Sequence, residues 1–384
     1  MQELKPQFTE EMQDHVGDRK VWHAPAFKIR DYRSLVEHIA RLSYANRNQL
    51  LFFRGQGADY QSKARGSSLY PGIYRGDNLV LAELEFKIRL LDNAGQDLSY
   101  LFEEHKISGW RDIKRKKYMQ WSILQHYEVV PTPLIDITQS LRVACSFAQH
   151  FSEDDKCYVF VVGLPYPTNR ISINSEEEIV NIRLLSICPP NALRPYFQEG
   201  YLAGTPDVTS NYDTKTELDL RNRLIAKFEI PSGKSFWNSG VEIMPKKALY
   251  PENDQVHELC KKIIPQARMQ KLGTGEIGNF IIQWARLEEI ILSYARKITQ
   301  RNLSIPEALR ALVQNGVISP VMASELDIVR RIRNVVAHKP DTVNELDVHK
   351  GLEMLKYLSK IIETKISESN RSKAQRQKKS KEVK

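Results

Sequence analysis

Residues 50–56 read Leu-Leu-Phe-Phe-Arg-Gly-Gln, and this short stretch organises the first two-thirds of the chain. Four successive apolar residues predict a buried strand that ends at Arg54-Gly55, where the glycine permits a sharp turn. A second strand is predicted at Leu134–Thr138, because the two prolines just before it disfavour a helix. Further buried strands are predicted at Tyr158–Val162 and at Leu224–Ile230.

Helices are predicted between and around these strands. The apolar spacing indicates them at residues 31–42, 79–93, 118–126, 141–151, 234–240 and 256–264. Residues 1–24 are expected to be irregular, and residues 165–222 to be rich in loops. Because strands and helices mix without regular βαβ alternation, the expected fold class is α+β, a mixed sheet with helices.

After Pro265 the pattern becomes entirely helical. Residues 273–278 are interpreted as a linker, and an apolar stripe at three- and four-residue steps begins at Phe280. A further helix starts at Ser304 with a capping residue, and the last is expected over residues 344–366. We therefore expect an α+β domain at 25–268, an all-α bundle at 275–366 and a disordered basic tail at 367–384.

Composition limits the classes of protein to consider. The chain has 384 residues, so two domains are the default. It contains no apolar run of eighteen residues and no apolar N-terminal segment, so we expect a cytoplasmic protein without a membrane partner. Its four cysteines are scattered without a paired motif, so reduced thiols are expected rather than disulfides or a metal site.

The net charge of +9 is concentrated at the C-terminal end. Residues 371–384 contain seven Lys or Arg and one Glu, which gives +6 and leaves +3 for the rest of the chain. With almost no apolar residues this tail cannot bury a face, so it is expected to be disordered. It either attracts nucleic acid through phosphate contacts or serves only to keep the protein soluble.

Several short motifs follow one another along the N-terminal region. They are Phe53-Arg54-Gly55 with Gln56, SLYPGIYR at 68–75, QHY at 125–127 with LIDIT at 134–138, the segment 190–200, and LYPE at 249–252. Similar motifs occur in the same order in the FRG domain family of bacterial proteins. Residues 25–268 thus resemble an FRG domain, although Pro133 and Ile137 replace the family's usual Arg and Trp. The resemblance implies a ligand site made by Arg54, Gln56, Tyr127, Asp136, Thr138, Arg194 and Gln198.

The FRG fold is in turn similar to that of ADP-ribosyltransferases. This similarity implies that Arg54 holds a phosphate of NAD and that Asp136 and Thr138 line its nicotinamide side. Gln198 or Glu199 would then take the place of the catalytic glutamate. The alternative interpretation is structural, with Arg54 and Asp136 forming a buried ion pair beneath a glycine turn.

Arg333-Asn334 and His338 form the second candidate site, near the expected end of a helix. An imidazole can move the proton of an attacking 2′-hydroxyl while a guanidinium holds the phosphate, and this chemistry needs no metal. The bundle resembles HEPN domains, whose catalytic members cleave RNA with this motif. That resemblance implies a homodimer in which two copies of the motif face each other.

Helix geometry supports the dimer. Residues five apart on a helix point about 140° away from each other, so one chain aims both groups at one phosphate only if its helix ends before His338. Pro340 favours such an early end, because it disfavours helix at Lys339. Otherwise Arg333 and His338 must come from different chains, or the motif serves only for dimerisation.

The sequence therefore favours a bacterial toxin or phage-defence effector. In this hypothesis an FRG sensor or ligand-binding domain is coupled to a metal-independent HEPN ribonuclease, with RNA as substrate and no cofactor. Arg333, Asn334 and His338 would be catalytic, and an antitoxin would be a further partner. In the alternative hypothesis the FRG domain is an ADP-ribosyltransferase that uses NAD, and the helical bundle only dimerises.

Overall fold

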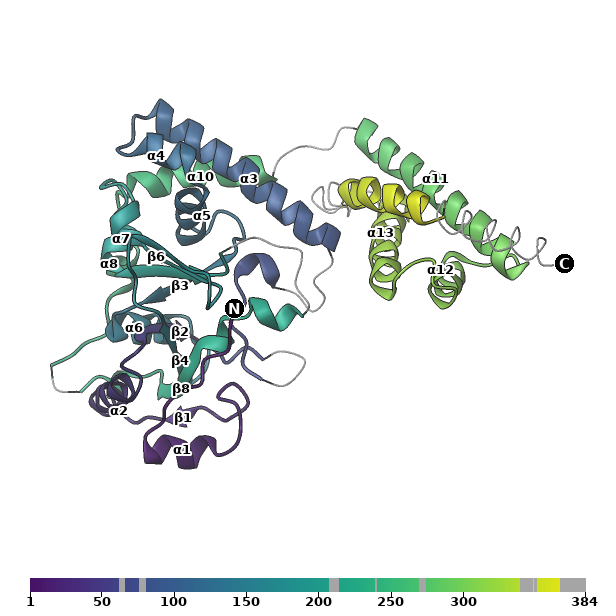
Figure 1. Cartoon of the computed structure of the whole chain (residues 1–384). Coiled ribbons are helices and arrows are strands. Elements are labelled where there is room, and N and C mark those ends of the chain that lie inside the picture. The colour runs from purple at the N-terminus through teal and green to yellow at the C-terminus, as the bar shows by residue number, and fades with distance from the viewer. Residues whose placement is uncertain are drawn as a thin grey trace. The chain divides into compact units, whose positions relative to one another are not determined.

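The computed structural model describes residues 1–61, 66–75, 81–206, 214–238, 240–268, 274–338, 348 and 351–366. The chain divides into two compact units (Figure 1). The first comprises Met1–Leu79 and Lys87–Ala267, and the second comprises Val80–Phe86 and Arg268–Lys384. Among the described residues, the first unit combines a sheet with helices and the second contains helices alone. This agrees with the fold class expected from the sequence.

The first unit is built on an eight-stranded mixed sheet with strand order β1-β8-β4-β2-β3-β7-β6-β5. The strands are β1 (Phe27–Lys28), β2 (Leu50–Gln56), β3 (Leu134–Thr138), β4 (Lys156–Leu164), β5 (Ile171–Asn174), β6 (Ile179–Arg183), β7 (Gly200–Gly204) and β8 (Leu224–Pro231). The pair β1/β8 is parallel, and all other neighbours are antiparallel.

Helices surround this sheet. Those of the first unit are α1 (Glu10–Val16), α2 (Tyr32–Ala45), α3 (Leu81–Glu104, whose first residues belong to the second unit), α4 (Trp110–Arg115), α5 (Lys117–His126), α6 (Leu141–His150), α7 (Leu184–Ile187), α8 (Arg194–Phe197), α9 (Lys246–Leu249) and α10 (Gln255–Arg268). Short 3-10 turns are η1 (Gly72–Tyr74), η2 (Lys215–Leu218), η3 (Leu220–Arg223) and η4 (Lys234–Phe236). Figure 1 shows α1 and α2 near the β1 end of the sheet.

Apolar side chains cover both faces of the central strands. On one face, Leu35 of α2 and Ala144 of α6 pack with Val161 of β4 in a single cluster. On the other face, Phe52 of β2 and Phe160 of β4 pack in a second cluster with apolar side chains of neighbouring strands and of loops. Because both faces are buried, the central strands read as nearly continuous apolar runs, and each fully buried large side chain contributes about 1.5–3 kcal/mol.

Gly55 allows α6 to approach the sheet closely. A Cβ atom at this position would lie 1.8 Å from the main-chain oxygen of Ala144 and 2.8 Å from the main-chain nitrogen of Ala148. The sequence predicted that the strand would end here in a sharp turn. This prediction is wrong, because β2 continues to Gln56. The glycine is therefore required by the contact between backbones and not by a sharp turn.

The sheet divides between β2 and β3. β2 pairs with β4 along its whole length, and β3 does the same with β7. Between β2 and β3, in contrast, only Phe53 and Thr138 are in register. Beyond this single pair the two strands separate, which leaves space in the middle of the sheet.

Two expectations for the first unit are wrong. Residues 1–24 contain α1, which Thr9 caps by accepting a hydrogen bond from the Met12 main chain. Residues 165–222 contain β5, β6 and β7 besides short helices. These strands are only four or five residues long, so each gives little local signal. β5 pairs with the nearby β6, whereas β7 pairs with β3, which is distant in sequence.

The second unit contains α11 (Thr274–Thr299), α12 (Ile305–Gln314) and α13 (Pro320–His338), with residues 351–366 also helical. The apolar stripe expected from Phe280 onward is buried in one cluster with side chains of all these helices. Ser304 and Glu307 form a capping box at the start of α12, and Gly316 with φ +68° follows its end.

The linker predicted at residues 273–278 is wrong from Thr274 onward, because α11 begins there. Gly273 lies outside the described residues, as do most of 339–350 and the predicted basic tail at 367–384. Val348 and Leu355, predicted to face inwards in the last helix, are buried. No helix in the described part of the chain is long and apolar enough to cross a membrane. All four cysteines are free and buried.

The contact at Gly55 gives a test of the fold. In Gly55→Ala the new methyl group would collide with the backbone of α6, so we expect the free energy of unfolding to fall by about 2–4 kcal/mol. The control is Gly233→Ala, because Gly233 is exposed and its Cβ would meet nothing nearer than 3.7 Å. Urea unfolding measures both, and equal stability of the two variants would contradict the close approach.

Candidate functional site

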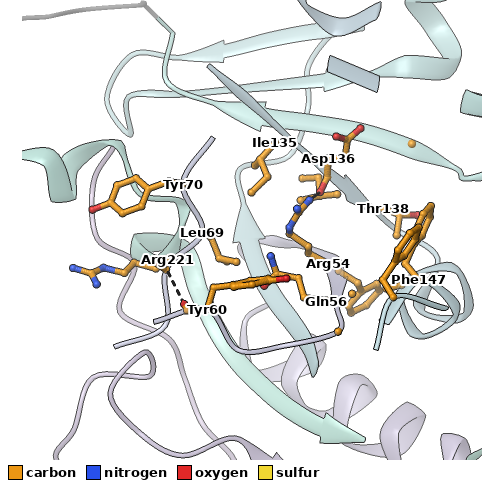
Figure 2. Close-up of a pocket in the computed structure, with 18 of the residues that line it drawn as sticks. Arg54, Gln56, Tyr60, Leu69, Tyr70, Ile135, Asp136, Thr138, Phe147 and Arg221 are labelled. Carbon is orange, nitrogen blue, oxygen red and sulfur yellow. Dashed lines mark hydrogen bonds between the residues drawn. The ribbon is translucent and has the colours of Figure 1, made fainter. Parts of the chain in front are cut away.

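A cavity of about 880 Å³ lies in the first unit, where β2 and β3 separate. Its walls come from both strands, from α6 and from the loops that follow β2 and precede η3. Figure 2 shows Arg54 in the middle, with Phe147 and Thr138 towards one end and Leu69 and Tyr70 towards the other. This volume is typical of sites for small ligands.

The described lining residues give the cavity a net positive charge. Four are cationic and two are carboxylates, namely Arg54, Arg75, Lys215, Arg221, Glu128 and Asp136. Part of this charge is already compensated, since Arg221 lies 3.4 Å from Asp219. An anionic ligand is therefore favoured over a cationic one.

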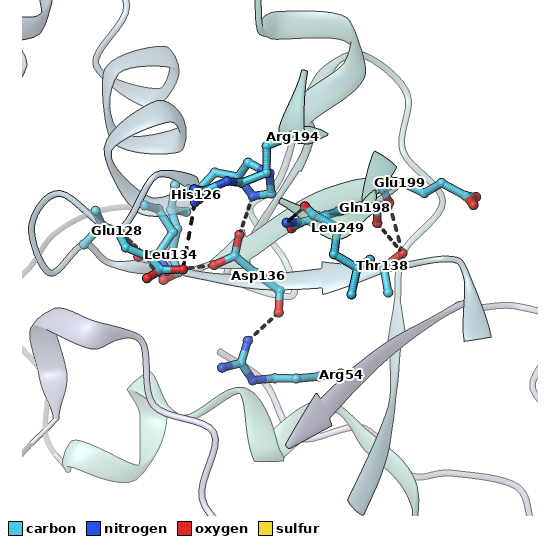
Figure 3. Close-up of polar contacts among 12 residues, drawn as sticks. Arg54, His126, Glu128, Leu134, Asp136, Thr138, Arg194, Gln198, Glu199 and Leu249 are labelled. Atoms are coloured by element: carbon cyan, nitrogen blue, oxygen red, sulfur yellow. Dashed lines mark hydrogen bonds and ion pairs between the residues drawn. The ribbon is translucent and has the colours of Figure 1, made fainter. Parts of the chain in front are cut away.

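Arg54 projects from β2 across the gap to β3. Its Nη1 atom donates to the main-chain oxygen of Asp136 at 2.6 Å (Figure 3). Its Nε atom is buried and has no partner among the described residues, and no described residue accepts a hydrogen bond from Nη2. Burial lowers the pKa of Arg54 to about 10, against the opposing effect of Asp136, so the guanidinium stays charged at neutral pH.

The carboxylate of Asp136 turns away from Arg54 and towards α5. Oδ1 lies 2.8 Å from His126 Nδ1, and Oδ2 accepts a hydrogen bond from Gln125 Nε2 at 2.8 Å. Burial works to raise the pKa of Asp136, but the contacts with His126, the hydrogen bond from Gln125 and the charge of Arg54 together outweigh it, and the pKa is lowered. The ion pair of the alternative, structural interpretation is wrong, since the Arg54 guanidinium contacts the main-chain oxygen of Asp136 instead of its carboxylate.

His126 is a site residue that the sequence analysis did not single out. Its side chain is 2% exposed, and its Nε2 atom is buried without a partner among the described residues. Its main-chain oxygen accepts a hydrogen bond from Arg194 Nη1 at 3.0 Å. The signal was present in the QHY motif at 125–127, but only the fold brings it to Asp136.

Tyr127 and Arg194 lie behind the cavity wall and do not line it. The Tyr127 hydroxyl donates to Asp254 at 2.7 Å, and burial, followed by the charge of Asp254, raises the pKa of Tyr127. The guanidinium of Arg194 lies 4.9 Å from the ring of Tyr127 and 4.8 Å from that of Tyr250. Both residues therefore support the site by packing behind it.

Gln56, Thr138 and Gln198, also expected at the site, line the cavity. The Oε1 atom of Gln56 is buried without a partner among the described residues. The Thr138 hydroxyl lies 3.0 Å from the main-chain oxygen of Gln198, and the Gln198 side chain donates to Leu249 at 2.8 Å. Glu199 is exposed and outside the lining, so it does not present its carboxylate to the cavity.

Aromatic rings form the wall beside Asp136. The rings of Phe147, on α6, and Phe151, which directly follows α6, are nearly parallel, at 10°, with centroids 6.1 Å apart. The Tyr250 ring stands at 76° to Phe147. Burial, followed by the charge of Glu128, raises the pKa of Tyr250 to about 12, so its hydroxyl stays protonated. These faces can stack against a planar group.

The second unit carries the Arg-Asn motif on α13. Arg333 Nη1 donates to Asn334 Oδ1 at 3.1 Å, and its Nη2 lies 3.9 Å from Glu288 on α11. Pro340 favoured a helix that ends before His338. In the structure α13 includes His338. The His338 side chain lies outside the described residues. One straight helix therefore separates the directions of the two positions by about 140°.

Removing the imidazole tests how Asp136 is held. In His126→Phe we expect the pKa of Asp136 to rise, because a donor to its charged form is lost. The pKa of Asp136 in the folded protein lies below the ordinary value of 3.8, so its ionised form stabilises the wild-type fold above pH 3.8. This stabilisation is lost as the pH falls through the pKa of the folded protein. Carboxyl ¹³C NMR titration measures the shift. His126→Asn, which keeps an N–H donor, is the control, and an unchanged pKa in His126→Phe would contradict the contact.

Comparison with known proteins gives one match. A search of curated proteins finds no relative, and a search of solved structures finds none either. The family model described as the FRG domain matches residues 49–157, a segment narrower than the 25–268 expected from the sequence. It spans β2, α3 to α6 and β3, and so includes Arg54, His126 and Asp136. Residues 49–157 of this chain therefore contain an FRG domain.

Proposed function

We propose that the cavity in the first unit binds a nucleotide and that Arg54 holds one of its phosphates. The observation that carries this proposal is the guanidinium itself. One of its nitrogens is fixed by Asp136, while the edge formed by Nε and Nη2 donates to no described residue. A guanidinium edge with two parallel N–H groups matches the geometry of a phosphate.

The rest of the cavity suits the remainder of a nucleotide. Arg75 and Lys215 add positive charge on the side of Arg54 that faces Tyr70. Phe147 and Tyr250 offer aromatic faces to a base. Together these contacts combine charge for phosphate with stacking for a planar ring, as a nucleotide requires.

ADP-ribosyl transfer from NAD would use the same cavity but needs a carboxylate close to the glycosidic bond. Gln198 is bound to Leu249, and Glu199 lies outside the lining. Of the described residues, Asp136 and Glu128 are the carboxylates that line the cavity. A transferase reaction would therefore depend on one of these two, so NAD is included among the test ligands.

The helical unit has a second candidate function, RNA cleavage without a metal. The observation that favours it is the hydrogen bond from Arg333 to Asn334, which holds the guanidinium in a fixed direction on α13. Because α13 includes His338, the two groups would meet at one phosphate only across a dimer. In this scheme the nucleotide site of the first unit acts as sensor, and the helical unit acts as effector in a toxin or phage-defence protein.

Nucleotide binding is tested by calorimetry with ADP-ribose, NAD and ATP. In Arg54→Gln a charged hydrogen bond to phosphate is lost, so we expect affinity to fall by at least about tenfold. Arg33→Gln removes an equal charge from an exposed position on α2 and should change affinity less than about twofold. Absence of binding of all three ligands to the wild type, or equal binding by Arg54→Gln, would refute the proposal.

RNA cleavage is tested with the full chain, in EDTA, on labelled single-stranded RNAs. We expect the wild type to cut and both Arg333→Ala and His338→Ala to lose at least about 100-fold in rate, because each removes a group that acts in the transition state. Arg331→Ala, at an exposed position of the same helix, is the control and should retain activity. Equal rates for all four proteins would exclude the motif as the catalytic site.

A further inference from the structure

Asp136 lines the cavity, and the phosphate contact proposed for Arg54 does not use its carboxylate. Its side chain is 37% exposed, although its partner His126 is almost completely buried. Among the described residues, each of its carboxylate oxygens has one hydrogen-bond partner, His126 for Oδ1 and Gln125 for Oδ2. A carboxylate oxygen can accept two, so both oxygens can receive a further donor from a ligand.

The carboxylate is held in one orientation before any ligand binds. Gln125 is itself fixed, because the Thr132 hydroxyl donates to its Oε1 atom at 2.6 Å. Arg194 fixes the main chain of His126 from behind. A binding group whose neighbours already determine its direction loses little conformational entropy when the ligand arrives.

The charges near Asp136 favour a neutral donor over a cation. Arg54 bonds to its main-chain oxygen, and Arg75 and Lys215 also line the cavity. A cationic ligand group would therefore meet the net positive charge of the cavity. A hydroxyl group can donate to the carboxylate without this repulsion, and such charge-assisted bonds are strong.

Position then selects the kind of hydroxyl. Figure 3 shows the main-chain oxygen of Asp136 directed to Arg54 and its carboxylate directed to the opposite side. The guanidinium proposed to hold the phosphate is thus bonded to the same residue of β3 that carries the carboxylate. In a nucleotide, a phosphate and the ribose hydroxyls are separated by only a few bonds.

We infer that Asp136 binds the ribose hydroxyls of the nucleotide whose phosphate lies on Arg54, so that the cavity selects ribonucleotides over deoxyribonucleotides. This inference rests on the proposed nucleotide binding. Gln125 and His126 are positioning residues, since they orient the carboxylate and leave the ligand contact to Asp136. Phe147 and Tyr250, on the same side of the cavity, then take the base.

The test compares ATP, 2′-deoxy-ATP and 3′-deoxy-ATP by calorimetry on the full chain. We expect at least one deoxy analogue to bind the wild type about tenfold or more weakly, as for loss of a hydrogen bond to a charged group. Asp136→Asn should bind ATP more weakly and lose most of this difference, because its main-chain oxygen still holds Arg54 while its charge is gone. Asp154→Asn, exposed and outside the lining, should keep the wild-type ratio.

The outcomes separate this inference from the proposal beneath it. If the wild type binds ATP and both analogues equally, the ribose contact is refuted while nucleotide binding stands. If Asp136→Asn keeps the full difference in affinity between ATP and the deoxy analogues, another residue binds the ribose hydroxyls and the assignment to Asp136 is wrong. If the wild type binds none of the three, nucleotide binding and the ribose contact are refuted together.

Discussion

The hydrogen bond from Arg54 to the main-chain oxygen of Asp136 connects the two halves of the sheet where their ladder stops. Beyond the pair Phe53 and Thr138 the strands have no further residues in register, so this side chain spans the separation. The same separation creates the cavity. The Arg54 guanidinium therefore links the two strands and places a positive charge in the middle of the cavity. It holds the main chain of Asp136, while Gln125 and His126 of α5 orient the carboxylate of Asp136 from the other side.

Sequence pattern was sufficient for the parts of the fold that are decided locally. The central strands are long apolar runs buried on both faces, and the first helical stripe repeats at regular steps, so both were predicted. The strands within 165–222 were missed because they are short, and because β7 pairs with β3, which lies far away in the sequence. The glycines near residue 273 suggested a linker, yet Gly278 lies within α11 with open space around it.

The candidate site could be predicted only in part, namely where its residues lie in local sequence motifs. Arg54, Asp136 and Thr138 belong to recognisable motifs, and they do line one cavity. Their partners could not be foreseen, since the donors to the carboxylate come from α5 and not from Arg54. His126 gained importance only through the packing of α5 against β3. For the helical unit, a motif of this spacing identifies residues on α13, but no local pattern tells which chain completes the site.

The two outer strands of the sheet are short. β1 has only Phe27–Lys28, and β5 has only Ile171–Asn174. An added chain would find few free main-chain groups at either edge, because the number of hydrogen bonds it could form is limited by the length of the outer strand. The sheet is thereby protected against uncontrolled polymerisation, even though Ile173 is exposed at one border.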